Sequence, residues 1–262
     1  IIADNGAIYL TAKAKNSLSQ AVVNHSGIIE ANRVMQNAKG EIILLGDMQY
    51  GKTNVSGTLK AEGKNGADGG FIETSAAKVN IADGTKVSTL SDRGKTGEWL
   101  IDPYNVVISN ATGTGSGFVA NQDDTVINAT TLTNALATTG VTVSTGGTAV
   151  GTQEGNITVD ADLAWTSNST LTLQADNDII LNKQITATNG GLTLNAVNNI
   201  SANDAVNVGT FTLAQGNWLQ NAPLLPSFYA KDFRLNGGSF IRALGGDGSV
   251  ATPWKLTEIY GV

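Results

Sequence analysis

The chain has 262 residues with 31 glycines, 4 prolines and no cysteine, and only 15% of its residues are charged, which leaves a net charge of −6. This composition excludes an all-helical protein, which would need more Leu, Glu and Lys. The absence of any basic run argues against a nucleic-acid partner, since phosphate neutralisation dominates such affinity. No apolar stretch reaches the roughly 20 residues of a membrane-spanning helix, so we expect no membrane insertion.

Residues 1–98 contain short apolar runs separated by Gly, Asn, Asp and Lys, as expected for strands joined by turns. Two runs follow a shared Asn-x-Ser-Gly pattern, at Asn24–Gly27 and Asn54–Gly57. The spacing of the runs varies, which predicts irregular β-helix rungs with corner loops of different lengths, because closure entropy grows slowly with loop length. The chain begins at Ile1–Asp4 without a signal peptide, so we expect it to be a piece of a longer protein.

Residues 99–150 interrupt this rhythm. Trp99–Pro103 predicts a strand that ends at an Asp-Pro turn, Val106–Ile108 predicts another, and a Gly/Thr/Ser linker follows at Thr112–Gly117. The strand pattern resumes at Val141–Val143. We therefore expect a strand-plus-helix insertion within a solenoid.

The helix of this insertion is predicted at Asn128–Leu136. An Asn/Thr cap opens it, Leu132 and Leu136 share one face, and Gly140 is expected to end it.

Residues 151–220 repeat themselves with an offset of 21 residues. Leu171–Ala175 aligns with Leu192–Ala196, and the match continues without a gap. The later pairs are Asn177 over Asn198, Ile179 over Ile200, Asn182 over Asn203, and Ile185 over Val206. A short period of β-branched runs and Asn/Gly corners predicts a parallel β-helix, in which the Asn pairs form amide ladders.

Three further expectations follow from this alignment. Ile157–Val159 precedes Leu171 by only 14 residues, which predicts one short rung, and Phe211–Leu213 follows Leu192 by 19, which predicts a tightened one. Lys183 falls over Asp204, which predicts a surface ion pair.

Residues 221–262 open with Pro223 and Pro226 and are rich in aromatic residues. We expect either a terminal coil that seals the core or the start of another module. The rings could also stack on sugars, with core closure the favoured interpretation. From residue 218 on, the aromatic residues are Trp218, Phe228, Tyr229, Phe233, Phe240, Trp254 and Tyr260.

Paired carboxylates are what a polysaccharide-cleaving β-helix enzyme would need, as a calcium site or as acid and base. The candidates are Asp123 with Asp124, Asp160 with Asp162, and Asp176 with Asp178. We expect these pairs to be solvated corners, because one repeat beyond Asp176 and Asp178 the chain has Val197 and Asn199.

Two other features suggest chemistry only superficially. His25 is the only histidine, and no nucleophile elbow accompanies it, so we expect a structural or exposed side chain. Gly245–Gly248 resembles one calcium-binding repeat but occurs once, which predicts a turn. We therefore expect no catalytic, metal-binding or cofactor-binding residue, and no cofactor.

Several stretches together resemble the exoproteins of Gram-negative two-partner secretion, the filamentous-haemagglutinin-like and high-molecular-weight adhesins. The Trp-Leu-Ile-Asp-Pro block is the most specific part of the resemblance. The stretches are Gly69–Ser75, Val79–Ile81, Gly97–Val106, Thr130–Val143, Phe240–Gly248 and Pro253–Gly261. The secretion-signal domain of that family carries Asn-Pro-Asn motifs, and the chain has no Asn-Pro, so we expect it to lie downstream of that domain.

The resemblance implies a right-handed parallel β-helix, export through an outer-membrane transporter partner, and display on the cell surface. A chain without cysteine suits threading through a pore. The expected function is a non-enzymatic, adhesive segment that attaches to a host-cell receptor or a carbohydrate. The alternatives are a polysaccharide-cleaving enzyme and an exopolysaccharide-binding matrix module. The expected segments are irregular rungs (1–98), the insertion (99–150), regular rungs (151–220) and the aromatic terminal part (221–262).

Overall fold

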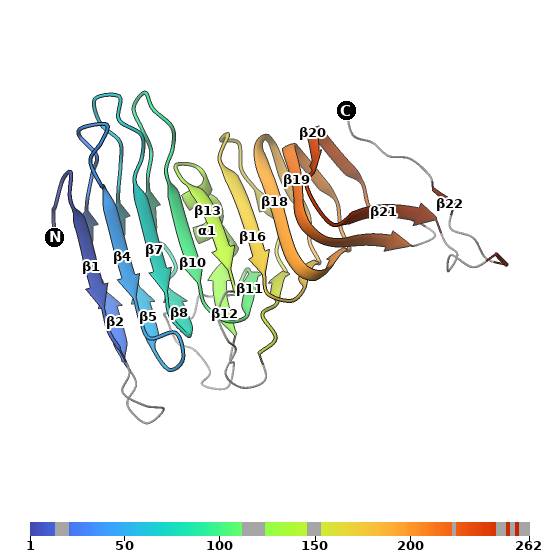
Figure 1. The fold of residues 1–262 in the computed structure, drawn as a ribbon, viewed down its shortest axis with the longest axis horizontal. Coiled ribbons are helices and arrows are strands. Elements are labelled where there is room, and N and C mark those ends of the chain that lie inside the picture. The colour runs from blue at the N-terminus through green and yellow to red at the C-terminus, as the bar shows by residue number, and fades with distance from the viewer. Residues whose placement is uncertain are drawn as a thin grey trace.

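A computed structural model describes residues 1–13, 21–111, 124–145, 153–221, 224–244, 250–251 and 255–256. These residues form an all-β fold dominated by parallel sheets, with one short helix in the part described (Figure 1). The all-β class expected from the composition is therefore confirmed.

The chain passes repeatedly over the same three faces, and we call each pass a coil. The first face holds β1 (Ala7–Thr11), β4 (Glu41–Leu45), β7 (Phe71–Ser75), β10 (Glu98–Asp102), β13 (Gly140–Ser144) and β16 (Thr170–Ala175). The second face holds β2 (Val22–His25), β5 (Lys52–Val55) and β8 (Lys78–Ile81), and then β12 (Thr125–Asn128), β11 (Val106–Ser109), β14 (Ile157–Val159) and β17 (Ile179–Leu181). Every strand pair within these sets is parallel wherever it forms a ladder.

The third face changes character along the molecule. It starts with β3 (Ile28–Glu30), β6 (Thr58–Lys60) and β9 (Lys86–Ser88), and α1 (Ala129–Leu136) then packs against β9 in place of a strand. β15 (Leu163–Ala164) follows. The long strands β18 (Ile185–Ala202), β19 (Val206–Asn221) and β20 (Phe228–Leu235) bend around corners and so serve several faces. β21 (Ser239–Leu244) pairs with β19 and, antiparallel, with β22 (Lys255–Leu256).

One column of side chains runs through the core beneath the first face. Strand side chains alternate between the two sides of a sheet, so the in-register parallel pairing places an apolar residue from each coil directly over the previous one. All members of the column are buried. They are Ile8, Ile42, Ile72, Trp99, Val141, Leu171, Leu192 and Phe211. The column continues through Trp99, so the expected insertion does not interrupt the first face.

The 21-residue repeat is confirmed by the pairing of β16 with β18. Leu171 pairs with Leu192 and Ala175 with Ala196, and the tightened rung is confirmed because Leu192 pairs with Phe211. The expected short rung is wrong. Ile157–Val159 lies on the second face and pairs with Ile179–Leu181, so its distance from Leu171 compares strands of two different faces.

The helix is confirmed, but its predicted end is not. The Asn128 side chain caps α1 by accepting hydrogen bonds from the backbone N–H groups of Thr130 (3.0 Å) and Thr131 (3.1 Å). Leu132 and Leu136 are buried. The helix ends at Leu136, capped by Ala137, whereas Gly140 already begins β13. The chain turns back into the first face within three residues, which leaves no room for a glycine-capped turn.

The Asn-x-Ser-Gly pattern marks one repeated corner of the first coils. Asn24 pairs with Asn54, whose side-chain amide donates to the Asn24 oxygen at 2.6 Å. Gly57 adopts a φ of +84°, and a Cβ atom there would lie 2.2 Å from the carbonyl oxygen of Gly27. Only glycine fits this corner.

Five aromatic rings fill the core of the last coils. Phe211, Trp218 and Phe228 are buried, Phe233 and Phe240 are partly buried against them, and the ring centroids in contact are 5.0 to 6.1 Å apart. The interpretation as core closure is therefore confirmed for Trp218, Phe228, Phe233 and Phe240. Tyr229 is exposed. Trp254, Tyr260 and Gly245–Gly248 lie outside the described residues, as do Thr112–Gly117.

Candidate functional site

A step in the surface lies where the third face turns into the first. In the first three coils this corner is made by long loops, at residues 31–40, 61–70 and 89–97, whereas residues 137–139 and 165–169 make it in the next two. Figure 1 shows the long loops projecting beyond the strand ends at the blue-to-green end of the molecule. The last long loop, residues 89–97, therefore projects beyond the shorter corners next to it, and we call the long-loop side of this step the loop wall.

An open groove of about 740 Å³ lies at this step and crosses the ends of β7, β10, β13 and β16. Its floor contains backbone of Gly70, Gly97 and Gly140, together with the outward side chains of Thr142 and Thr172. The groove thus runs across four coils rather than into the core.

Glycine is required in this floor by close backbone contact. A Cβ atom at Gly70 would lie 2.0 Å from the carbonyl oxygen of Gly40, and one at Gly97 would lie 2.0 Å from that of Gly70. Because the chain stacks backbone on backbone at these positions, the floor is flat and polar.

Two cations line the groove and take part in no ion pair among the described residues. Arg33 is half-buried, and its Nε donates to the carbonyl oxygen of Lys39 at 2.8 Å. Lys95 is exposed. The described ion pairs join Lys60 to Glu30, Lys64 to Glu62, Arg93 to Asp92 and Arg234 to Asp232.

One carboxylate lines the groove, and it is hydrogen-bonded to the next coil. Glu98 accepts a hydrogen bond from the hydroxyl of Thr142, one coil further on. Phe71, at the start of β7, presents a half-buried ring to the same space. The arrangement offers cations, hydroxyl groups and an aromatic ring, but no pair of free acids.

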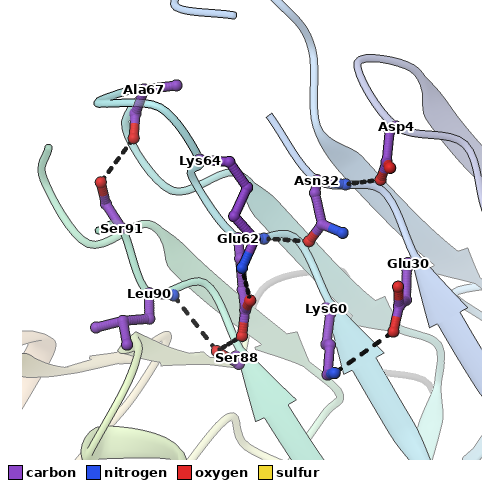
Figure 2. A network of polar contacts seen from close by, with 10 residues as sticks. All are labelled: Asp4, Glu30, Asn32, Lys60, Glu62, Lys64, Ala67, Ser88, Leu90 and Ser91. Atoms are coloured by element: carbon purple, nitrogen blue, oxygen red, sulfur yellow. Dashed lines mark hydrogen bonds and ion pairs between the residues drawn. The ribbon is translucent and has the colours of Figure 1, made fainter. Parts of the chain in front are cut away.

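Polar contacts between coils hold the long loops that border the groove, as Figure 2 shows. Asp4 accepts from the backbone N–H of Asn32 at 3.1 Å, and the Asn32 side chain accepts from the N–H of Glu62 at 3.0 Å. Glu62 accepts from the hydroxyl of Ser88 at 2.7 Å. Each bond joins one coil to the next, so the loops are tied into a continuous wall.

Glu62 is the titratable centre of this network. Burial alone would raise the pKa of its carboxyl, but hydrogen bonds from Lys64 and Ser88 and the charges of Lys64 and Lys60 outweigh that and lower the pKa. Glu62 is therefore held ionised as a structural link between coils.

The candidate carboxylates of the sequence have a similar structural role. Asp160 accepts from the side-chain amide of Asn182 at 2.7 Å, and Asp162 accepts from the backbone N–H of Gln184 at 3.2 Å. Asp178 likewise accepts from the N–H of Asn199 at 2.9 Å. All three bonds reach to the following coil.

The remaining candidates are not gathered into a site. Asp176 is exposed, and Asp124 precedes β12. Asp123 lies outside the described residues. Among the described residues, no group of three or more His, Cys, Asp and Glu side chains is placed to hold a metal ion.

Lys183 and Asp204 form no ion pair in the described structure, so that prediction is wrong. The ladder that stacks these corners uses the neighbouring amides instead, because Asn203 donates to Asn182 directly beside them. Lys183 is exposed, where solvent competes with a direct contact, and the half-buried Asp204 accepts a hydrogen bond from the backbone N–H of Ala205 at 2.7 Å.

His25 ends β2 with its side chain 8% exposed, in register with the core residue Val55. Its Nε2 is buried and has no hydrogen-bond partner. Burial lowers the pKa of His25, so the side chain is neutral at pH 7. The first coil thus carries a histidine where the next two carry Val55 and Ile81.

The sequence alone does not identify the residues that line the groove. A usable signal exists: Gly70 and Gly97 directly precede first-face strands, Gly140 begins one, and the corner loops shorten after residue 97. Recognising it requires the strand register, which the drifting spacing of the first coils conceals.

The comparisons with known proteins identify no relative. The chain matches no protein-family model, no curated protein and no solved structure. No helix within the described ranges has the length and apolar character to cross a membrane.

Proposed function

We propose that the chain is a right-handed parallel β-helix. Parallel pairing of each strand with its counterpart one coil later supports this, since parallel crossover connections are right-handed in about 98% of cases. Each coil pairs in register with its neighbouring coils, as the repeats of a solenoid do.

We propose further that it serves as a non-enzymatic, adhesive segment of a large secreted surface protein of the two-partner secretion type. The observation that carries this is the unbroken core column from Ile8 to Phe211, one residue per coil. Each added coil lengthens such a stack by about 4.8 Å. A rod of this kind holds binding groups away from the surface that anchors it.

The use of the carboxylates supports a structural role over a catalytic one. A glycosidase needs two carboxyl groups facing one sugar ring. In this chain Asp160, Asp162 and Asp178 each accept a hydrogen bond from the following coil. These carboxylates thus serve as links between successive coils.

Two features suit export and display. The chain has no cysteine, so no disulfide would form before passage through an outer-membrane transporter pore. The resemblance of the Trp99–Pro103 block to the adhesin family points to the same route. The proposed partners are therefore that transporter during secretion and a host-cell receptor or carbohydrate afterwards.

The test is binding of the purified chain to a panel of glycans and polysaccharides, with released reducing sugar measured in the same wells. We expect binding without release. Release that disappears in the Asp160→Asn, Asp162→Asn double variant would establish the polysaccharide-cleaving alternative. Absence of binding to every glycan, and to epithelial cells presented in parallel, would contradict the adhesive role and leave a spacer.

A further inference from the structure

The groove at the end of the long corner loops has the shape of a site for an extended polymer. It crosses four neighbouring strands, β7, β10, β13 and β16, which are spaced about 4.8 Å apart. It is open rather than enclosed, so a ligand can enter and leave along its length. A compact metabolite would leave much of such a channel empty.

Its floor is chemically suited to sugar hydroxyl groups. Thr142 and Thr172 pair in register and present hydroxyls on the outer side of the first face, and Thr170 lines the same floor. The hydroxyls of Thr170 and Thr172 can both donate and accept hydrogen bonds, as sugar hydroxyls do, whereas the Thr142 hydroxyl donates to Glu98 and is left as an acceptor. The half-buried ring of Phe71 adds an apolar surface for one face of a pyranose.

The basic side chains on the loop wall favour a ligand that carries an anionic group at this end of the groove. Arg33 and Lys95 lie on the loop wall without an ion-pair partner among the described residues. Glu98 accepts a hydrogen bond from the Thr142 hydroxyl and keeps its negative charge, so the lining holds two positive charges against one negative charge. The hydrogen bond from Nε of Arg33 to Lys39 fixes the orientation of its guanidinium group. A planar fork held in place is well matched to a carboxylate or sulfate.

The rest of the molecule makes this local pair of cations selective. The whole chain carries a net charge of −6, so a polyanion gains nothing from the surface in general. Attraction between a polyanion and the groove cations should weaken as salt rises, because exposed charges are screened over about 10 Å at 0.1 M ionic strength.

We propose that this groove binds an anionic polysaccharide, with Arg33 and Lys95 holding a carboxylate or sulfate group and the threonine floor contacting neutral sugar hydroxyls. The inference rests on the proposed adhesive function for its ligand class, and it adds the location and charge of the contact. It involves no chemical step.

The experiment measures the affinity of the purified chain for three polymers: alginate, which carries carboxylates, dextran sulfate, and neutral dextran. The Arg33→Gln, Lys95→Gln double variant removes the two groove cations. The matched control is Lys183→Gln, Lys231→Gln, which removes two exposed lysines outside the groove and gives the same net charge. A second test variant, Thr172→Tyr, fills the floor without changing charge.

We expect native protein to bind one or both polyanions and not dextran, with affinity falling as salt rises. The cation double variant should bind at least about tenfold more weakly, since hydrogen bonds to charged groups contribute more than neutral ones. Thr172→Tyr should weaken binding similarly, and the control by less than about twofold. Preference for alginate or for dextran sulfate identifies the anionic group.

Equal loss in the groove and control variants, unchanged binding in Thr172→Tyr, or failure of native protein to bind either polyanion would overturn the inference. If native protein still attaches to cells or neutral glycans in that last case, the adhesive role stands without the groove. Release of reducing sugar from alginate would instead overturn the proposed function.

Discussion

Asn203 donates its side-chain amide to the side-chain oxygen of Asn182 at 2.8 Å, and the two residues are 21 positions apart in the chain. Asn182 donates in turn to Asp160 at 2.7 Å, so three successive coils are joined at one corner. A second ladder joins Asn198 to Asn177 with the same separation. The sequence repeat is thus visible in the structure as a bond from each coil to the previous one.

Replacing Asn182 by Ala should lower the free energy of unfolding by about 1 kcal/mol, because it removes both bonds of this ladder while the corner stays solvated. Chemical denaturation measures the change. The matched control is Lys183→Ala at the next position, which should change stability by less than about 0.5 kcal/mol. Equal effects of the two substitutions would mean that the amide ladder contributes nothing specific.

Substitutions of a buried and an exposed aromatic residue in the last coils should differ strongly in their effect on stability. Phe211→Ala should destabilise the chain by roughly 3 to 5 kcal/mol, because it empties the centre of a cluster that contains Trp218 and Phe228. Tyr229→Ala, on the exposed side of β20, should cost less than about 0.5 kcal/mol. Thermal unfolding of both variants tests this assignment of core and surface, and reversed costs would refute it.

Stability should also depend on pH through His25. Burial lowers its pKa in the folded chain below the ordinary 6.5, so the unfolded chain binds the proton more readily below that pH. Native protein should therefore lose stability, relative to His25→Val, as pH falls below about 6.5. Above that value the difference between the two proteins should stay constant.

Valine is the suitable replacement because Val55 occupies the same register position one coil later. Groups other than His25 titrate in both proteins, so the difference between their unfolding free energies isolates the histidine. A difference that does not change between pH 7.5 and 5, on the scale of about 1.4 kcal/mol per pK unit, would show that His25 is not buried as described.

The regular coils could be predicted because successive coils there differ by only a few residues in length. With a period of 21 residues, Leu171 and Leu192 align by simple offset, and the same offset predicts the Asn ladders. The helix could be predicted equally well, since Asn128 is a local capping signal. These features depend on residues close in sequence or on one repeated distance.

The rest could not be predicted because corners of variable length hide the register. Ile157 resembles Leu171 in pattern, yet it pairs with Ile179 on another face, and only the three-dimensional path separates the two. The groove depends on the same information. Arg33 and Lys95 are 62 positions apart, and loops of different coils bring them to one cavity.

Deletion of residues 171–191 tests the stacked-coil account most directly. Leu192 would then follow Thr170 and take the register position of Leu171, so every later residue keeps its face. Deletion of residues 171–190 is the matched control, because Gly191 would take that position and the following side chains would point to the opposite face.

The measurement is thermal unfolding followed by far-ultraviolet circular dichroism. We predict a cooperative, β-rich fold for the 21-residue deletion and its loss for the 20-residue deletion. Loss of β structure in both, or its retention in both, would contradict the account.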